Sequence, residues 1–187
     1  MDSNVVDLIM NDHRELERIF DQLMTQPDKR PSLVPVMITL LTAHSRAEES
    51  EVYPAAKDSG GSEDVEHSQK EHLEADQLAA KVAETDYDSP EFGEALQKLI
   101  DAVKHHVEEE ETDLLPTLEE SVDRTRLEEL GERFEEQRVE LLSDHGYDGG
   151  AVTGDETKAE LYEHAKEADI PGRSSMNKDE LARALRD

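Results

Sequence analysis

The sequence contains neither cysteine nor tryptophan, and aromatic residues make up only 4% of its 187 residues. Without cysteine the chain can form no disulfide, no thiolate metal site and no thiol nucleophile. No run of residues approaches the roughly 18 apolar residues that a membrane span requires. The first ten residues also lack the basic and apolar segments of a signal peptide. We therefore expect a soluble, cytoplasmic protein with no membrane contact.

Positive charge is scarce as well, because 20 Lys and Arg residues stand against 48 Asp and Glu residues, for a formal net charge of −28. A surface so negative repels phosphate groups, which argues against general binding to nucleic acid or to anionic membranes. The acidity suits a salt-adapted organism, although acidic surface helices alone would give the same charge. Nothing in the composition indicates the oligomeric state.

Helical periodicity is the dominant pattern that the sequence does contain. Apolar residues recur every three or four positions in four long segments, and strand-like alternation is almost absent. Chain breakers such as Gln26-Pro27 and Asp58-Ser59-Gly60-Gly61 separate the segments. Long helices with short connections predict an all-α fold, an up-down-up-down four-helix bundle. The four segments cover about residues 3–24, 31–57, 62–84 and 89–120.

Beyond the four segments, the sequence predicts an extra helix over residues 124–142 and then a change of character. The glycine-rich stretch 144–154 is typical of a flexible linker. Residues 155–187 contain two short segments with capping patterns, which predict a helix–extended loop–helix module. We thus expect a bundle over residues 1–143, with its core in 1–120, followed by the linker and the module. In the extra helix the predicted buried face consists of Leu127, Leu130, Phe134 and Leu141.

Part of the sequence is repeated. A histidine followed by glutamate at +4 and proline at +10 occurs at His44, Glu48 and Pro54, and again at His106, Glu110 and Pro116. The two copies fall on the second and fourth predicted helices. Histidine and glutamate four residues apart share one helix face and can reach the same ligand.

Helix faces separate the eight histidines into inward and outward groups. Residues advance about 100° each along a helix, which places His13 on the apolar face of the first helix and His72 on that of the third, with Val65, Ala79, Ala80 and Ala83. His67 points nearly opposite to His72, and His105 and Glu109 lie about 100° from His106 and Glu110, toward solvent. The inward set is His13, His44, Glu48, His72, His106 and Glu110.

A metal explains this inward set better than ordinary packing does. One inward histidine is usually a hydrogen-bonded core residue, but a buried unpaired carboxylate is costly, and no Lys or Arg falls on these apolar stripes. Imidazole with carboxylate and no thiolate suits iron, manganese or zinc, and two carboxylates suit the bridging of two metal ions. A ferritin-type site would need Glu-x-x-His pairs, and none of the eight histidines has glutamate three residues before it.

These residues resemble the hemerythrin-like (HHE cation-binding) family over about residues 1–120. The similarity lies in Asp12-His13-Arg14, His44-x-x-x-Glu48 with Tyr53-Pro54, Glu71-His72 and His106-x-x-x-Glu110. The resemblance implies a non-haem di-iron centre in which Glu48 and Glu110 bridge and the four histidines are terminal ligands.

The sequence departs from the oxygen-carrying hemerythrins at two positions. Ser68 stands where the carriers have a fifth histidine, and the second carboxylate is Glu110 at +4 instead of an aspartate at +5. One iron should therefore have an open position or another oxygen ligand. Tyr53 is either a phenol near this position or a packing residue. We expect a protein that binds or senses oxygen, NO, peroxide or iron. The alternatives are a di-iron enzyme that detoxifies peroxide or NO, and a regulatory protein whose C-terminal module contacts DNA or a protein partner.

Residues 155–187 are similar to the small module of the Rho-termination-factor N-terminal type, which also ends many bacterial Ku proteins. The unusual string Ile170-Pro-Gly-Arg-Ser-Ser-Met176 is the main basis of this similarity. The segment has 6 basic and 9 acidic residues, a net charge of −3, which favours a protein contact or an inert folded tail over contact with DNA or RNA. Phosphate contact would depend on Lys166, Arg173, Lys178, Arg183 and Arg186 gathering on one side.

Overall fold

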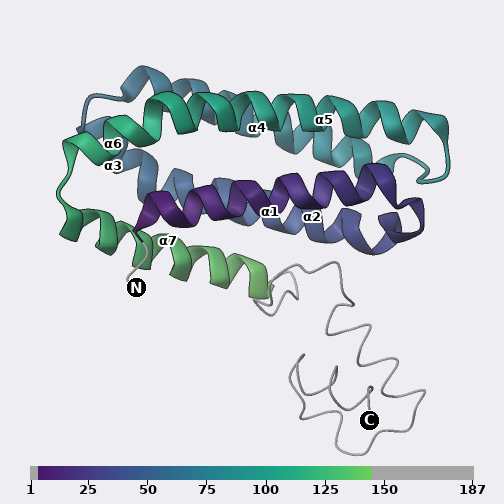
Figure 1. Ribbon diagram of the computed structural model, residues 1–187, viewed down its shortest axis with the longest axis horizontal. Helices are drawn as coiled ribbons and strands as arrows, with labels where there is room; N and C mark the ends of the chain where they lie inside the picture. Colours follow the sequence, from purple (N-terminus) through teal and green to yellow (C-terminus); the bar gives the residue numbers. More distant parts are fainter. Residues whose placement is uncertain (1–3, 145–187) are drawn as a thin grey trace, which may run out of the picture.

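Residues 4–144 are the part of the chain that the computed structural model describes, and helices account for every regular element in that part. Four long helices run antiparallel in chain order, and α7 lies along the outside of α1 and α2 (Figure 1). The predicted all-α, up-down-up-down bundle with an extra helix is thereby confirmed. The elements are α1 (Val5–Thr25), η1 (Pro27–Lys29), α2 (Arg30–Ala47), η2 (Glu48–Val52), α3 (Tyr53–Asp58), α4 (Ser62–Glu84), α5 (Pro90–Glu109), η3 (Glu110–Leu114), α6 (Leu115–Ser121) and α7 (Arg124–Asp144).

Local sequence signals explain where the long helices begin and end. The Asn4 side chain accepts a hydrogen bond from the Asp7 N–H at 3.1 Å and so caps α1. Pro90 occupies the first position of α5, where its missing N–H costs nothing. Between α3 and α4 the chain turns at Gly60, whose φ of +101° is a conformation that side chains disfavour.

The second and fourth predicted helices are each interrupted by one π-helical turn, which the sequence analysis did not anticipate. In η2 the Tyr53 N–H donates to the Glu48 carbonyl five residues earlier, and in η3 the Leu115 N–H donates to that of Glu110. A proline follows directly in both cases, and its ring would clash with the carbonyl four residues back in a regular α-helix. The widened turns accommodate the prolines, and they occur at the same place in both copies of the sequence repeat.

The hydrophobic core consists of two clusters. One, around Phe20, Met37 and Leu96, fills the end of the bundle near the α1–α2 connection, and the other, around Ile9 and Leu118, fills the opposite end beneath α7. The buried polar and charged residues lie between the clusters, at the level of the two π-turns. They are His13, His44, Ser45, Glu48, Ser68, His72, His106 and Glu110.

Two predicted core positions are wrong, and a third is only partly buried. Ala80 and Ala83 are exposed, and the buried face of α4 continues from His72 through Ala75, Ala79 and Val82. In α7 Leu142 is fully buried and Leu141 only half-buried, although Leu127, Leu130 and Phe134 are buried as predicted. Alanine has too little apolar surface to indicate which face of a helix is buried. Near a helix end, too few apolar residues remain to predict the buried face.

No helix within residues 4–144 is long and apolar enough to cross a membrane. Asp144, the first residue of the predicted linker, is the last residue of α7, and the rest of the predicted linker and the C-terminal module lie outside the described residues. The division of the chain into bundle, linker and module therefore stays a prediction.

Candidate metal centre

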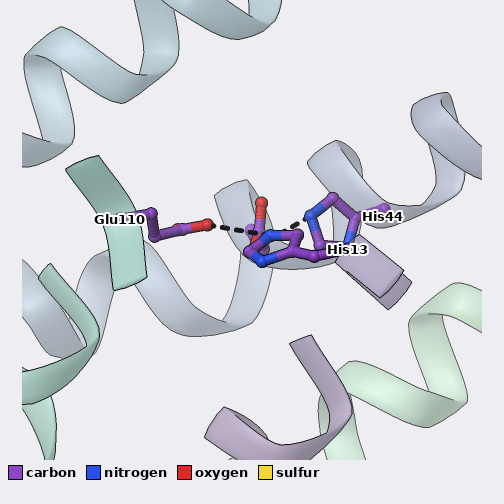
Figure 2. Close-up of side chains that lie close together, drawn as sticks. His13, His44 and Glu110 are labelled. Atoms are coloured by element: carbon purple, nitrogen blue, oxygen red, sulfur yellow. Dashed lines mark ion pairs between the residues drawn. The ribbon is translucent and has the colours of Figure 1, made fainter. Parts of the chain in front are cut away.

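All six side chains predicted to bind metal converge in the middle of the bundle. They come from every long helix, they are between 0% and 6% exposed, and Figure 2 shows His13, His44 and Glu110 pointing toward one another from three different elements. α1 supplies His13, α2 His44, η2 Glu48, α4 His72, α5 His106 and η3 Glu110.

Each glutamate lies between two histidines from different parts of the bundle. Glu48 has Oε1 at 3.3 Å from His44 Nε2 and Oε2 at 3.3 Å from His72 Nε2. Glu110 Oε2 lies 3.3 Å from His13 Nε2 and 3.6 Å from His106 Nε2. The ligand atoms form two groups, each closer than 4.8 Å throughout. The first is His13, His44, Glu48 and Glu110, and the second is Glu48, His72 and His106.

Most of the inward atoms lack a hydrogen-bond partner. Within residues 4–144, five of the six buried side-chain nitrogen and oxygen atoms without a partner belong to this centre, and the sixth is Gln22 Oε1. Each such group costs about 1–3 kcal/mol when it is left unsatisfied. The five are His13 Nε2, His44 Nε2, both Glu48 oxygens and Glu110 Oε2.

The outward nitrogen of every histidine in the centre meets a carboxylate. An Nδ1–H donated to a carboxylate leaves the Nε2 lone pair pointing inward, the tautomer that a metal ligand needs. His72 Nε2 and His106 Nε2 then present lone pairs to each other across 3.1 Å, and a cation between them removes that repulsion. The four pairs are His13–Glu111 at 2.8 Å, His44–Asp12 at 3.4 Å, His72–Glu49 at 3.2 Å and His106–Glu71 at 3.0 Å.

Three of these four outer carboxylates are held in turn by an arginine. Arg14 Nη2 donates to Glu111 at 2.6 Å, Arg46 Nη1 to Glu49 at 3.0 Å and Arg138 Nε to Asp12 at 2.6 Å. Arg138 belongs to α7, and Phe134 of the same helix packs edge-on against His44, so the extra helix supports the centre. The sequence analysis missed these partners.

Burial and charge set opposite protonation states on the two glutamates. Burial and the adjacent negative charge of Glu110 raise the pKa of Glu48 well above its usual range. Glu110 is equally buried, but the close approach of the His13 imidazole at 3.3 Å and the charges of His106 and His13 outweigh burial and lower its pKa to about 2. Burial lowers the pKa of His44 to about 4. Two buried carboxylates thus lie among four imidazoles, without a buried Lys or Arg among the described residues, and a divalent cation fits this donor set.

Tyr53 places its hydroxyl group inside the centre, and its ring packs against that of His72. The residue is 1% exposed, and its Oη lies 3.2 Å from His72 Nε2 and 3.4 Å from Glu110 Oε1. Burial, then the charges of Glu110 and Glu48, raise the pKa of this phenol well above its usual range, and a hydrogen bond with Ser68 opposes the shift. Ser68 itself is buried. Ser68 and the phenol of Tyr53 thus lie together beside His72 and Glu110.

A small cavity of about 10 Å³ adjoins the centre. All four histidines of the centre line it, and its apolar walls include Leu16, Leu41, Val103 and Val107. This volume is about that of one water position. A ligand larger than one water molecule would therefore require the surrounding side chains to move.

Comparison with known proteins identifies the family. The family model described as the hemerythrin HHE cation binding domain matches residues 4–118, more than half of the chain, and the protein belongs to this family. A crystal structure of a hemerythrin HHE cation binding domain-containing protein from Mycobacterium kansasii superposes with a TM-score of 0.68 at 19% identity, over 98% of this chain and 99% of that one, which shows the shared fold. The resemblance predicted from the sequence is confirmed for the bundle, and the chain is a metal-binding protein by family.

A curated relative is larger. A protein named "DNA nickase" from Nostoc sp. (strain PCC 7120 / SAG 25.82 / UTEX 2576) is 26% identical over 155 residues, which is 82% of this chain. The match covers 43% of that protein, so the chain spans less than half of its length. Neither comparison bears on the predicted C-terminal resemblance.

Proposed function

We propose that the six inward side chains bind two non-haem iron ions, with Glu48 and Glu110 as bridging carboxylates. His13 and His44 would complete one iron, and His72 and His106 the other. The main support is the set of buried atoms without partners, because five of them face one another and only a cation satisfies carboxylates and imidazoles together. The donor set would also accept manganese or zinc, and family membership favours iron.

We infer further that the centre binds or senses a small ligand such as oxygen, NO or peroxide, or responds to iron itself. Iron supplies an open coordination position and a reversible change of oxidation state. The residues of the protein would have three roles. The apolar walls of the cavity limit access to the centre, the outer carboxylates orient the imidazoles, and the Tyr53 hydroxyl group provides a proton or an oxygen ligand.

Detoxification of peroxide or NO is the second candidate, and the Tyr53 hydroxyl is the observation that favours it. A proton donor within hydrogen-bond distance of the reacting ligand serves turnover and is unnecessary for simple storage. Multiple turnovers of peroxide or NO by the iron-loaded protein would distinguish an enzyme from a sensor, which reacts once. We place DNA contact third, because the net charge of −28 opposes phosphate binding.

Metal analysis of the purified protein tests the central proposal. We expect about two irons per chain and a visible to near-ultraviolet absorption that responds to oxygen, NO or peroxide. Glu110→Gln and His72→Ala should each lose at least one iron, whereas Glu108→Gln, an exposed change of the same charge two residues from Glu110, should keep both. Unchanged iron in Glu110→Gln and His72→Ala would show that the ligand set is wrong.

A further inference from the structure

A second group of histidines and glutamates lies on the surface, across the α4–α5 contact. Each helix contributes a histidine and a glutamate four residues later, His67 with Glu71 on α4 and His105 with Glu109 on α5. The histidines are 56% and 62% exposed in their side chains. The ligand atoms of all four residues lie within 4.8 Å of one another.

The spacing of this group matches that of ligands around one metal ion. His67 Nε2 lies 3.0 Å from Glu109 Oε2 and 3.5 Å from Glu71 Oε1. His105 Nε2 lies 3.4 Å from Glu109 Oε1 and 3.8 Å from Glu71 Oε1. Zinc binds nitrogen and oxygen at roughly 2.0–2.2 Å in a tetrahedron, which puts neighbouring ligand atoms about 3.4 Å apart. The four side chains need little movement to reach that geometry.

Glu71 differs from the other three carboxylates that hold the histidines of the buried centre. Glu111, Glu49 and Asp12 each have an arginine partner. Within residues 4–144 no Lys or Arg forms an ion pair with Glu71, and the two exposed histidines stand where the arginine would be. In a strongly acidic protein, the one carboxylate of this set without an arginine partner is thus surrounded by metal-binding groups.

We propose that His67, Glu71, His105 and Glu109 form a surface site for a divalent transition metal such as Zn²⁺, coupled to the buried centre by Glu71. The coupling has a direct path. Glu71 Oε1 faces His67 and His105, and Glu71 Oε2 accepts the Nδ1–H of His106 at 3.0 Å. A metal on Oε1 withdraws charge from the carboxylate, weakens its hold on His106 and changes how strongly that imidazole binds its own metal. The coupling rests on the proposed iron centre, and the surface site does not.

Zn²⁺ titration of the iron-loaded full-length chain tests the surface site. We expect about one Zn²⁺ per chain beyond the iron content, with affinity lowered at least about tenfold in His67→Ala and in Glu109→Gln. Glu66→Gln and Glu108→Gln are matched controls, since they remove a negative charge at exposed neighbouring positions and should bind like the wild type. No additional Zn²⁺, equal binding by His67→Ala, or an equal loss in the controls would overturn the site.

The absorption of the iron centre tests the coupling. Saturating Zn²⁺ should shift the visible spectrum of the wild type and leave that of His67→Ala unchanged, although both hold the same amount of iron. A wild-type spectrum that does not change when Zn²⁺ binds would contradict the coupling. If the wild type shows no visible iron absorption even before Zn²⁺ is added, the buried iron centre is contradicted. The difference in Zn²⁺ stoichiometry between wild type and His67→Ala would then still test the surface site.

Discussion

Tyr53 is the single residue in the centre with a hydroxyl group close to both a histidine and a glutamate, among the residues that the structure describes. Its ring stacks on that of His72 with centroids 5.5 Å apart, so the ring and the hydroxyl group have separable roles. Tyr53→Phe keeps the ring and removes only the hydroxyl group. We expect normal iron content, a loss of about 1 kcal/mol in unfolding free energy, and reaction with peroxide or NO slowed roughly 100-fold.

Stopped-flow absorption of the iron-loaded variant measures this effect. Tyr87→Phe is the matched control, because Tyr87 is half-buried and packs on Phe92 away from the centre. If Tyr53→Phe reacts as fast as the wild type, the phenol is a packing residue.

Adjacent residues in the sequence have different roles at the centre. In the pairs Asp12-His13 and Glu71-His72 one residue faces inward, and the preceding carboxylate orients a histidine of another helix, His44 or His106. Neighbours on a helix differ by about 100° in direction, which lets one residue point into the centre while the next reaches around it.

The inward residues could be predicted from the sequence, and their outer partners could not. His106 and Glu110 were preferred over His105 and Glu109 by helix face and by the repeat, and burial agrees with that choice. The pairing of Glu71 with His106 depends on how α4 and α5 pack, which no single helix reveals. The available signal was the acidic residue next to four of the six inward side chains, which are His13, Glu48, His72 and Glu110.

Each of the two π-turns places two consecutive glutamates against the same histidine. Glu48 and Glu49 reach Nε2 and Nδ1 of His72, and Glu110 and Glu111 reach the same two nitrogens of His13. His72 and His13 are thus each held between two carboxylates of one widened turn. Helical periodicity predicted both helices but not the turns, because one inserted residue leaves the apolar pattern on either side nearly intact.

Shortening η3 by one residue tests whether the widened turn is needed. Deletion of the exposed Asp113 removes the extra residue of the turn while Pro116 remains. We expect the bundle to stay folded but to lose some stability through the proline clash, and Glu110 and Glu111 to turn away from His13, so that one or both irons are lost. Asp113→Ala keeps the length of the turn and should keep the iron. Iron analysis with circular dichroism separates the two effects, and a folded deletion variant that retains two irons would show that the π-turn is dispensable.

For the whole molecule, the centre joins two otherwise separate hydrophobic clusters. All four long helices contribute a ligand candidate to this polar layer, so bound metal acts on the stability of the entire bundle. The net charge of −28 adds self-repulsion that a pair of buried cations partly offsets. The composition predicts the acidic character of the protein. It does not predict the separation of the core into two clusters, because this depends on which parts of the four helices lie side by side.

Removal of iron should therefore lower the unfolding temperature, and the size of the drop should depend on pH. A metal present at about 100 times its dissociation constant stabilises by about 2.7 kcal/mol, or roughly 5–10 °C for a chain of this size. Burial disfavours the charged forms of His13 and His106. The nearby carboxylate of Glu110 for His13, and the hydrogen bond with Glu71 and the charge of Glu110 for His106, outweigh burial and raise the pKa of both imidazoles above 6.5. Protons then compete with iron for these two imidazoles at neutral pH.

The sign of the pH effect follows from that competition. Iron requires unprotonated imidazoles, so the temperature difference between iron-loaded and iron-free protein should be largest above the raised pKa values of His13 and His106 and should shrink as pH falls through them. His44 should not add to the loss in that range, because burial lowers its pKa to about 4. Differential scanning calorimetry of both forms between pH 8 and about pH 5, with proton release on iron loading measured in parallel, checks the argument. A temperature difference that grows toward acid would show that the two histidines are not metal ligands.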